Sequence, residues 1–224
     1  MSDFIEFEQI PFGSDSFADN PEPRCPCILL LDTSGSMAGK PINQLNEGIR
    51  AFHEELLNDP LAKKRVEIAI VTFGPVKIES DFHTVPNFLP QDLEANGDTP
   101  IGIAIITAIE LLNKRKNEYK THGHPYYKPW IFLITDGAAT DNYIAASELV
   151  KDGESKNSFA FFAIGVEGAN MSMLKQISVR EPLKLQGLKF VEFFKWLSAS
   201  MKMVSSKNPG SNINMLPPSG WAQL

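Results

Sequence analysis

Residues 28–41 read ILLLDTSGSMAGKP, and this stretch decides the fold. The run of four apolar residues can form a strand that is buried on both faces, as the strands of parallel sheets usually are. The strand then ends on Asp32, and hydroxyl side chains follow at Ser34 and Ser36. Because alternate residues of an extended chain share one side, these three polar side chains can converge.

Apolar strands alternate with amphipathic helices along most of the chain. Strands are predicted at 27–31, 65–74, 76–82, 130–137, 159–166 and 182–185. Helices are predicted from Ile42 to before residue 58, from Pro100 onward, and at 142–151, 171–177 and 190–203. The pattern predicts an α/β fold with a doubly wound, mostly parallel central sheet and helices on both faces. The turn at Gly74-Pro75 predicts one antiparallel edge strand.

The sequence divides into three parts. Residues 1–26 are expected to form an N-terminal arm, which lies on the domain or extends into solvent and in which FIEFEQI alternates enough to pair as an edge strand. Residues 27–203 form the domain. Residues 204–224 form a C-terminal tail whose MLPPSGW segment is either a docking peptide or a disordered end.

Composition excludes several classes of protein. The 224 residues are 43% hydrophobic and 21% charged, which suits a soluble domain that needs no disulfides, and the net charge of −6 argues against binding to nucleic acid. No apolar run is long enough to cross a membrane, and no signal peptide is recognisable. With only Cys25 and Cys27, separated by a proline, the expected location is the reducing cytoplasm.

The acids and hydroxyls predict a metal site. Asp136 ends the strand at 130–137, and if that strand neighbours the first one, Asp32 and Asp136 meet beyond the carboxyl ends, where such sheets bind ligands. NGDTP at 96–100 adds Thr99. A set of oxygens without His or Cys suits Mg²⁺ or Mn²⁺, whereas the scarcity of carboxylates makes Ca²⁺ less suitable.

The role of Thr99 as a metal ligand has an alternative. Thr99 can instead be the N-cap of the helix that begins at Pro100, and Asp98 competes for both roles.

The HGHPYY loop at 122–127 is either a transition-metal site at His122 and His124 or a solvated surface loop. Its Tyr126 and Tyr127 are expected to be exposed and available to a partner.

The motifs resemble a known family. Asp32-x-Ser34-x-Ser36, Thr99 in GDTP and Asp136 in TDG resemble the metal-ion-dependent adhesion site of von Willebrand factor A domains. More narrowly, LLLDTSGSMAGKPINQLNEGI, VTFG, LITDG and FFKWLSAS resemble the TerY-type bacterial proteins of tellurite-resistance and stress operons. The resemblance implies that Ser34, Ser36 and Thr99 contact the metal directly, and that Asp32 and Asp136 do so directly or through water.

The resemblance also implies a function. One metal position would be left open for an Asp or Glu of a protein partner, such as a kinase or phosphatase of the same operon. The expected function is therefore a non-enzymatic, metal-dependent interaction module. The alternatives are a phosphatase-like hydrolase that uses metal-bound water at the same site, and a scaffold that makes its contacts through the arm and the tail.

Overall fold

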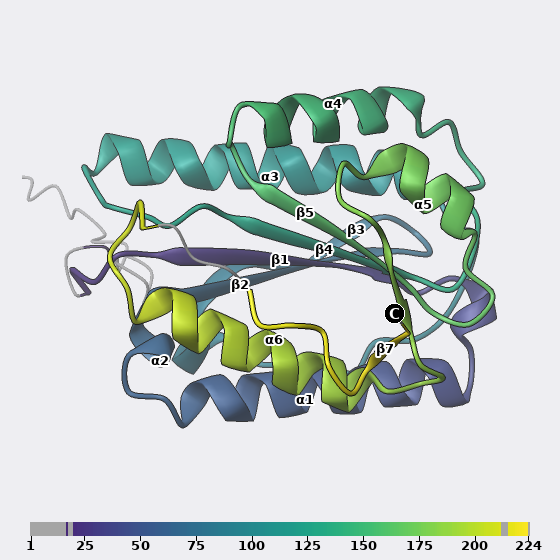
Figure 1. The fold of residues 1–224 in the computed structure, drawn as a ribbon, viewed down its shortest axis with the longest axis horizontal. Helices are drawn as coiled ribbons and strands as arrows, with labels where there is room; N and C mark the ends of the chain where they lie inside the picture. Colours follow the sequence, from purple (N-terminus) through teal and green to yellow (C-terminus); the bar gives the residue numbers. More distant parts are fainter. Residues whose placement is uncertain (1–16, 18–19, 212–214, 224) are drawn as a thin grey trace, which may run out of the picture.

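The computed structural model describes residues 17, 20–211 and 215–223, which form a central sheet between two layers of helices (Figure 1). Over these residues seven strands pair in the order β3-β2-β1-β4-β5-β6-β7. The strands are β1 (Cys25–Asp32), β2 (Val66–Phe73), β3 (Lys77–Thr84), β4 (Trp130–Thr135), β5 (Ala160–Gly165), β6 (Leu183–Leu185) and β7 (Ala222–Gln223). The helices are α1 (Lys40–Leu57), α2 (Ala62–Arg65), α3 (Ile101–Thr121), α4 (Ile144–Ser155), α5 (Met171–Ile177) and α6 (Phe190–Ser205), with 3₁₀ turns η1 (Gly35–Met37) and η2 (Val85–Asn87).

The pairing confirms the predicted doubly wound α/β sheet. β1 lies at the centre and pairs in parallel with β2 and β4, and β5 and β6 continue the parallel part. β3 is antiparallel to β2, as the turn at Gly74-Pro75 predicted. The sequence did not predict β7, which is antiparallel to β6 at the other edge.

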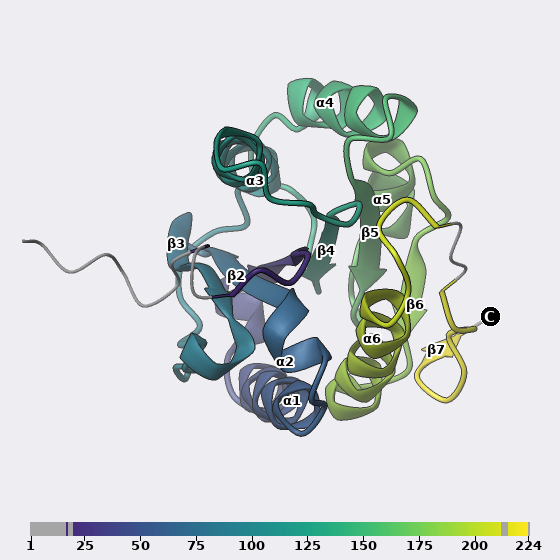
Figure 2. The same ribbon diagram turned by 90° about the vertical axis from the view of Figure 1, so that its left-hand side faces the viewer.

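Alternation along β1 explains why both faces of the sheet are covered. Cys27, Leu29 and Leu31 are buried in the core beneath α1 and α6, whereas Ile28 and Leu30 are buried beneath α3 and α4. Figure 2 shows these two helical layers on opposite sides of the sheet. A strand with apolar residues on both faces can only occupy the middle of such a three-layer structure.

Most predicted boundaries differ from the structure by a few residues, and the start of β1 and the bounds of α4 are two examples. β1 begins at Cys25 and not at residue 27, because Cys25 and Pro26 already pair with β2. The pairing of β1 with β4 begins only at Cys27. A proline is tolerated where one side of the strand has no ladder to donate to. α4 begins at Ile144, whose amide donates to the Asn142 side chain at 3.0 Å, and ends at Ser155.

The predicted arm is only partly described. The expected edge strand FIEFEQI lies outside the described residues. Near the end of the arm, Arg24 is fully buried, its amide donates to the Pro125 carbonyl at 3.0 Å, and its carbonyl accepts from the Tyr127 amide at 2.8 Å. Tyr127 is itself 3% exposed, so the prediction of an exposed tyrosine there was wrong.

The end of the tail packs onto its own domain. Trp221 is fully buried and lies 4.9 Å from the Phe193 ring and 5.0 Å from the Trp196 ring of α6. Trp196 Nε1 donates to the carbonyls of Leu216 and Pro217. The MLPPSGW segment is therefore neither a free docking peptide nor a disordered end.

Within the described part of the chain, no helix is both long and apolar enough to cross a membrane.

Candidate functional site

The predicted site residues lie at the carboxyl edge of the sheet. β1 and β4 pair in parallel, for example Leu30 with Leu133, so Asp32 at the end of β1 and Asp136 just after β4 leave the sheet at the same edge. Strand order reverses here, because β2 and β3 lie on one side of β1 while β4 and β5 lie on the other. Ligands of doubly wound sheets bind at this kind of switch point.

A row of hydrogen bonds joins the two strand ends. Ser36 Oγ donates to Asp136 Oδ1 at 2.7 Å, across 100 positions of sequence. Ser34 Oγ lies 3.0 Å from Ser36 Oγ, and because Ser36 uses its proton on the carboxylate, Ser34 is the donor in this contact. Three of the five predicted side chains are thus in direct contact, with Ser34 buried and Ser36 exposed.

Asp32 lies behind this row and is fully buried. Its Oδ1 accepts from the Ser34 amide at 2.8 Å, and its Oδ2 accepts from Thr135 Oγ1. The pKa of Asp32 is raised above its usual value. Burial is the main cause and the charge of Asp136 adds to it, whereas the hydrogen bonds from Ser34 and Thr135 act in the opposite direction. None of the ion pairs among the described residues includes Asp32. A buried carboxylate without a cation favours binding of a positive ion.

Thr99 lies on the other side of a small space. A Cβ placed on Gly137 would lie 3.5 Å from Thr99 Oγ1 and 4.0 Å from Asp32 Oδ2. The glycine therefore leaves the room between the threonine hydroxyl and the buried carboxylate open. Thr99 is 7% exposed, and its amide donates to Thr140 Oγ1 at 3.1 Å.

The alternative role of Thr99 as a helix cap was wrong. Pro100 occupies the N-cap position of α3 and makes no side-chain cap bond. Asp141 caps the helix instead, because its two carboxylate oxygens accept from the amides of Gly102 at 3.0 Å and Ile103 at 2.8 Å. Neither Asp98 nor Thr99 serves as the cap, so the Thr99 hydroxyl is free for another ligand.

Backbone hydrogen bonds hold the loops of the site together. The Gly35 amide donates to the Gly97 carbonyl at 3.0 Å, and the Asn96 amide donates to the Thr33 carbonyl at 2.7 Å. Gly97 has φ +77°, and a Cβ there would lie 1.9 Å from the Gly74 carbonyl oxygen. Only glycine fits where this loop crosses the turn between β2 and β3. The two hydrogen bonds from Gly35 and Asn96 fix the spacing between the loop of Ser34 and Ser36 and the loop that carries Thr99.

Sequence reasoning missed three residues of this arrangement. Thr135 orients the Asp32 carboxylate and also accepts from the Gly137 amide at 3.1 Å. A hydroxyl at the end of the apolar strand WIFLIT was the available signal for Thr135. No local pattern marks Gly137 as the spacer or Asp141 as the cap, because each acts on a residue that is distant in sequence.

The donor chemistry fits a hard cation. The five side chains supply two carboxylates and three hydroxyls, all of them oxygen donors. Among the described residues, no group of three or more His, Cys, Asp or Glu side chains could hold a metal ion. The transition-metal alternative for His122 and His124 is therefore unsupported, and each ring bonds a backbone carbonyl, of Glu118 and Glu22 respectively.

Comparisons with known proteins agree with this fold. The profile of the von Willebrand factor type A domain matches residues 27–184, more than half of the chain. Among solved structures, the vWF domain of the pilus tip protein Mfa5 from Porphyromonas gingivalis has a TM-score of 0.65 at 12% identity, and the match covers 85% of this chain and 99% of that one.

Two other similar structures belong to longer chains. The pilus adhesin SpaC from Lactobacillus rhamnosus GG has a TM-score of 0.63 at 13% identity, and the match covers 82% of this chain and 31% of that one. Proximal thread matrix protein 1 from the mussel byssus has a TM-score of 0.53 at 16% identity, with 81% and 49% covered. At these identities the likeness shows the fold alone. The search among curated proteins found no match to this chain.

Proposed function

Because the chain belongs to the von Willebrand factor type A family, we propose that five oxygen-bearing side chains at the carboxyl edge of its sheet hold a divalent metal ion. They are Asp32, Ser34, Ser36, Thr99 and Asp136. A protein partner would complete the site with the carboxylate of an Asp or Glu residue. The observation that carries this proposal is the hydrogen-bonded row of Ser34, Ser36 and Asp136 in front of the buried Asp32.

Mg²⁺ is the ion that this donor set suits best, with Mn²⁺ next. Two carboxylates are few for Ca²⁺, which takes six to eight oxygen ligands and usually several charged ones. In the arrangement that the family resemblance implies, three neutral hydroxyls bind directly, so the ion would supply positive charge that attracts a partner's carboxylate. The protein's own residues set the geometry, since Thr135 and the Ser34 amide fix the Asp32 carboxylate.

The resemblance to TerY-type sequences supports a more specific setting. We propose a cytoplasmic, bacterial complex of the tellurite or stress response, with a kinase or phosphatase of the same operon as the partner. This part of the proposal rests on the motifs in the sequence, and a membrane or a nucleic acid is not among the proposed partners.

We propose an interaction module rather than a hydrolase. A hydrolase that used this site would need a general base close to the metal. Three of the four histidines instead bond backbone carbonyls elsewhere: His53 that of Val85, His122 that of Glu118 and His124 that of Glu22. No observation at the site favours the hydrolase.

Titration calorimetry of MgCl₂ and MnCl₂ into chelator-stripped protein tests the metal site. We expect saturable binding by the wild type, and a loss of at least about tenfold in affinity for Ser34→Ala/Ser36→Ala. The control is Ser155→Ala/Ser206→Ala, which removes two exposed hydroxyls that bond only local carbonyls. Equal affinities for the two double variants would refute the assignment.

The partner's carboxylate needs a separate test. Arrays of peptides that carry a central Asp or Glu, with Asn or Gln as matched controls, would be probed with wild-type protein in Mg²⁺ and in chelator. We expect signals only from the acidic peptides and only with Mg²⁺. Binding that persists in chelator would contradict metal-dependent recognition.

A further inference from the structure

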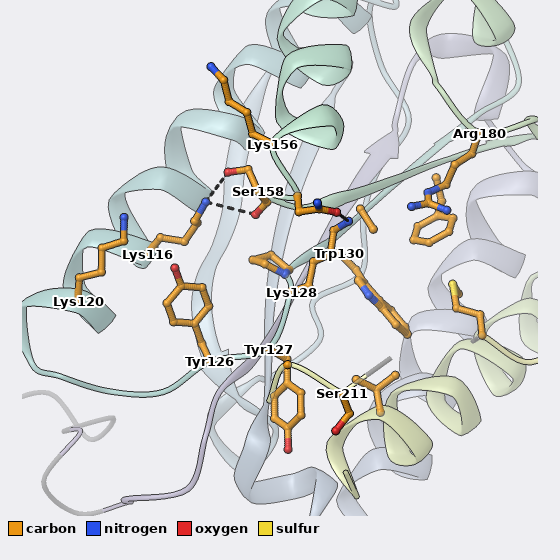
Figure 3. A pocket seen from close by; sticks show the side chains of 17 residues that line it. Lys116, Lys120, Tyr126, Tyr127, Lys128, Trp130, Lys156, Ser158, Arg180 and Ser211 are labelled. Carbon is orange, nitrogen blue, oxygen red and sulfur yellow. Dashed lines mark hydrogen bonds between the residues drawn. The ribbon is translucent and has the colours of Figure 1, made fainter. Parts of the chain in front are cut away.

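A second candidate site lies at the opposite edge of the sheet. A pocket of about 960 Å³ opens beside the amino ends of β4 and β5, bounded by α3, by the chain just before each of these two strands, and by Gly210, Ser211 and Met215 beyond α6 (Figure 3). Its volume is within the range of small-molecule sites. The metal site lies at the carboxyl ends of β1 and β4, so the two sites share no residues. We refer to this second site as the basic pocket.

The basic pocket concentrates positive charge on an acidic protein. Five of the residues that line it are cationic and none is acidic, although the chain carries a net charge of −6. The cationic residues are Lys116, Lys120, Lys128, Lys156 and Arg180.

Nearby carboxylates neutralise only part of this charge. Glu154 bonds Arg180 at 3.0 Å and lies 4.0 Å from Lys128, and Asp152 pairs with Lys156 at 2.8 Å. None of the ion pairs between described residues includes Lys116 or Lys120.

Lys116 and Lys120 form the side of the basic pocket whose positive charge is not balanced by these ion pairs. They are four residues apart on α3 and therefore lie on one face of the helix. Lys116 Nζ donates to Ser158 Oγ at 2.5 Å and to its carbonyl at 3.2 Å, and both acceptors are neutral (Figure 3). Burial and then the charge of Lys120 lower the pKa of Lys116. An anion between the two ammonium groups would relieve this repulsion.

The opposite side of the pocket has an apolar wall, beside which Arg180 lies over the Phe162 ring, 5.1 Å from its centroid. Pro129, Trp130, Val204 and Met215 line it. Tyr126 is half-buried, with its ring 5.0 Å from that of Tyr119. A ligand that fills the pocket therefore needs a charged end for the lysines and a larger apolar body for this wall.

We propose that the basic pocket binds an organic phosphate of about nucleotide size. The phosphate would lie against Lys116 and Lys120, and the body against Trp130 and Met215. Lysine serves as a point charge for phosphate groups, and the volume exceeds what an inorganic ion fills. The negative net charge of the protein repels extended polyanions, which favours a small ligand over a nucleic acid or a long acidic chain.

Calorimetry with ATP, AMP and pyrophosphate as probes, in chelator and low salt, tests the proposal without involving the metal site. We expect saturable binding of ATP or AMP to the wild type, and a loss of at least about tenfold in Lys116→Gln/Lys120→Gln. The control Lys114→Gln/Lys151→Gln makes the same change in charge at exposed positions outside the pocket and should bind within about twofold of the wild type.

Because Lys116 also bonds Ser158, its replacement can affect folding as well as binding, and a second variant that keeps Lys116 separates the two effects. Lys120→Glu reverses charge at an exposed position and should abolish nucleotide binding while leaving the melting temperature close to that of the wild type. Equal nucleotide affinity in wild type and Lys120→Glu, or no saturable binding of any probe, would overturn the proposal. Pyrophosphate binding as tightly as ATP would overturn the role of the apolar wall. A Glu-rich peptide is titrated under the same conditions, and tighter binding of that peptide than of ATP would overturn the identity of the ligand.

Discussion

Replacing Glu67 by glutamine should destabilise the fold strongly, because Glu67 ties β2 to α3 and to the chain that enters β1. Its side chain is fully buried. Arg115 donates to its two oxygens at 2.7 and 2.9 Å, the Tyr119 hydroxyl donates to Oε2, and Arg24 Nε lies 2.9 Å from Oε1. Glutamine keeps the shape but removes the buried negative charge that faces the guanidinium groups of Arg24 and Arg115.

The magnitude follows from burial and distance. A pair of unit charges about 4 Å apart contributes roughly 4 kcal/mol at an effective dielectric constant of about 20. Removing one partner of a buried pair costs about 3–5 kcal/mol in practice. We therefore expect Glu67→Gln to lower the free energy of unfolding by about 3–5 kcal/mol, which corresponds to roughly 10 °C in Tm for a domain of this size. Urea unfolding followed by circular dichroism measures it.

Glu118 provides the matched control. It pairs with the same Arg115 at 2.8 Å, but its side chain is 35% exposed. Solvent screens that pair, so Glu118→Gln should cost less than about 1 kcal/mol. A loss in Glu67→Gln no larger than that of Glu118→Gln would refute the reasoning, because burial would then not decide the strength of the pairs.

Three further outcomes follow from packing and burial. Trp221→Ala should lower the free energy of unfolding by about 3–5 kcal/mol in urea, because the fully buried indole is lost from the core; a loss below about 1 kcal/mol would mean that the tail is not anchored. Burial and then the charge of Glu67 raise the pKa of Cys25 from 9.0 to about 12, so the unfolded chain ionises first as pH rises. Stability should therefore fall from about pH 9 to 12, and the Cys25 thiol should react with a disulfide reagent only after unfolding; rapid labelling of the native protein would contradict this. Gly48→Ala should cost about 1–3 kcal/mol despite the better helix propensity of alanine, because its Cβ would lie 2.5 Å from Phe194 Cδ2; a gain in Tm would show that α6 moves away easily.

Local patterns were sufficient to predict the order of the longer strands and helices, but not the short α2 and β7. Apolar runs and helical spacing predicted the central strand, the antiparallel β3 and the α5 helix, whose predicted and observed bounds are both 171–177. The convergence of Asp32 and Asp136 could also be predicted, because parallel neighbours end at one edge of a sheet. That these residues bind a metal ion remains a prediction.

The role of Thr135 and the packing of the tail could not be predicted, because both depend on residues far away in sequence. Thr135 bonds Asp32 across 103 positions, and Trp221 is buried only because α6 offers Phe193 and Trp196. The tail itself is rich in Pro, Gly and Ser, a composition also typical of disordered ends. Composition describes a segment by itself, whereas its order here comes from a hydrophobic surface elsewhere in the domain.

The proposed cation site and the proposed anion site lie at opposite ends of β4, and this separation limits how far binding at one site can change affinity at the other. Thr135 at one end orients the buried Asp32, and Trp130 at the other lines the basic pocket. The six residues of β4 span roughly 17 Å at about 3.3 Å per residue. Both of its neighbours are paired in register, and all six residues are buried. Coupling between sites requires an element with two arrangements, and a packed central strand has only one. A cation at the carboxyl edge and an anion at the amino edge should therefore bind independently unless α3, whose two ends approach both sites, shifts as a unit.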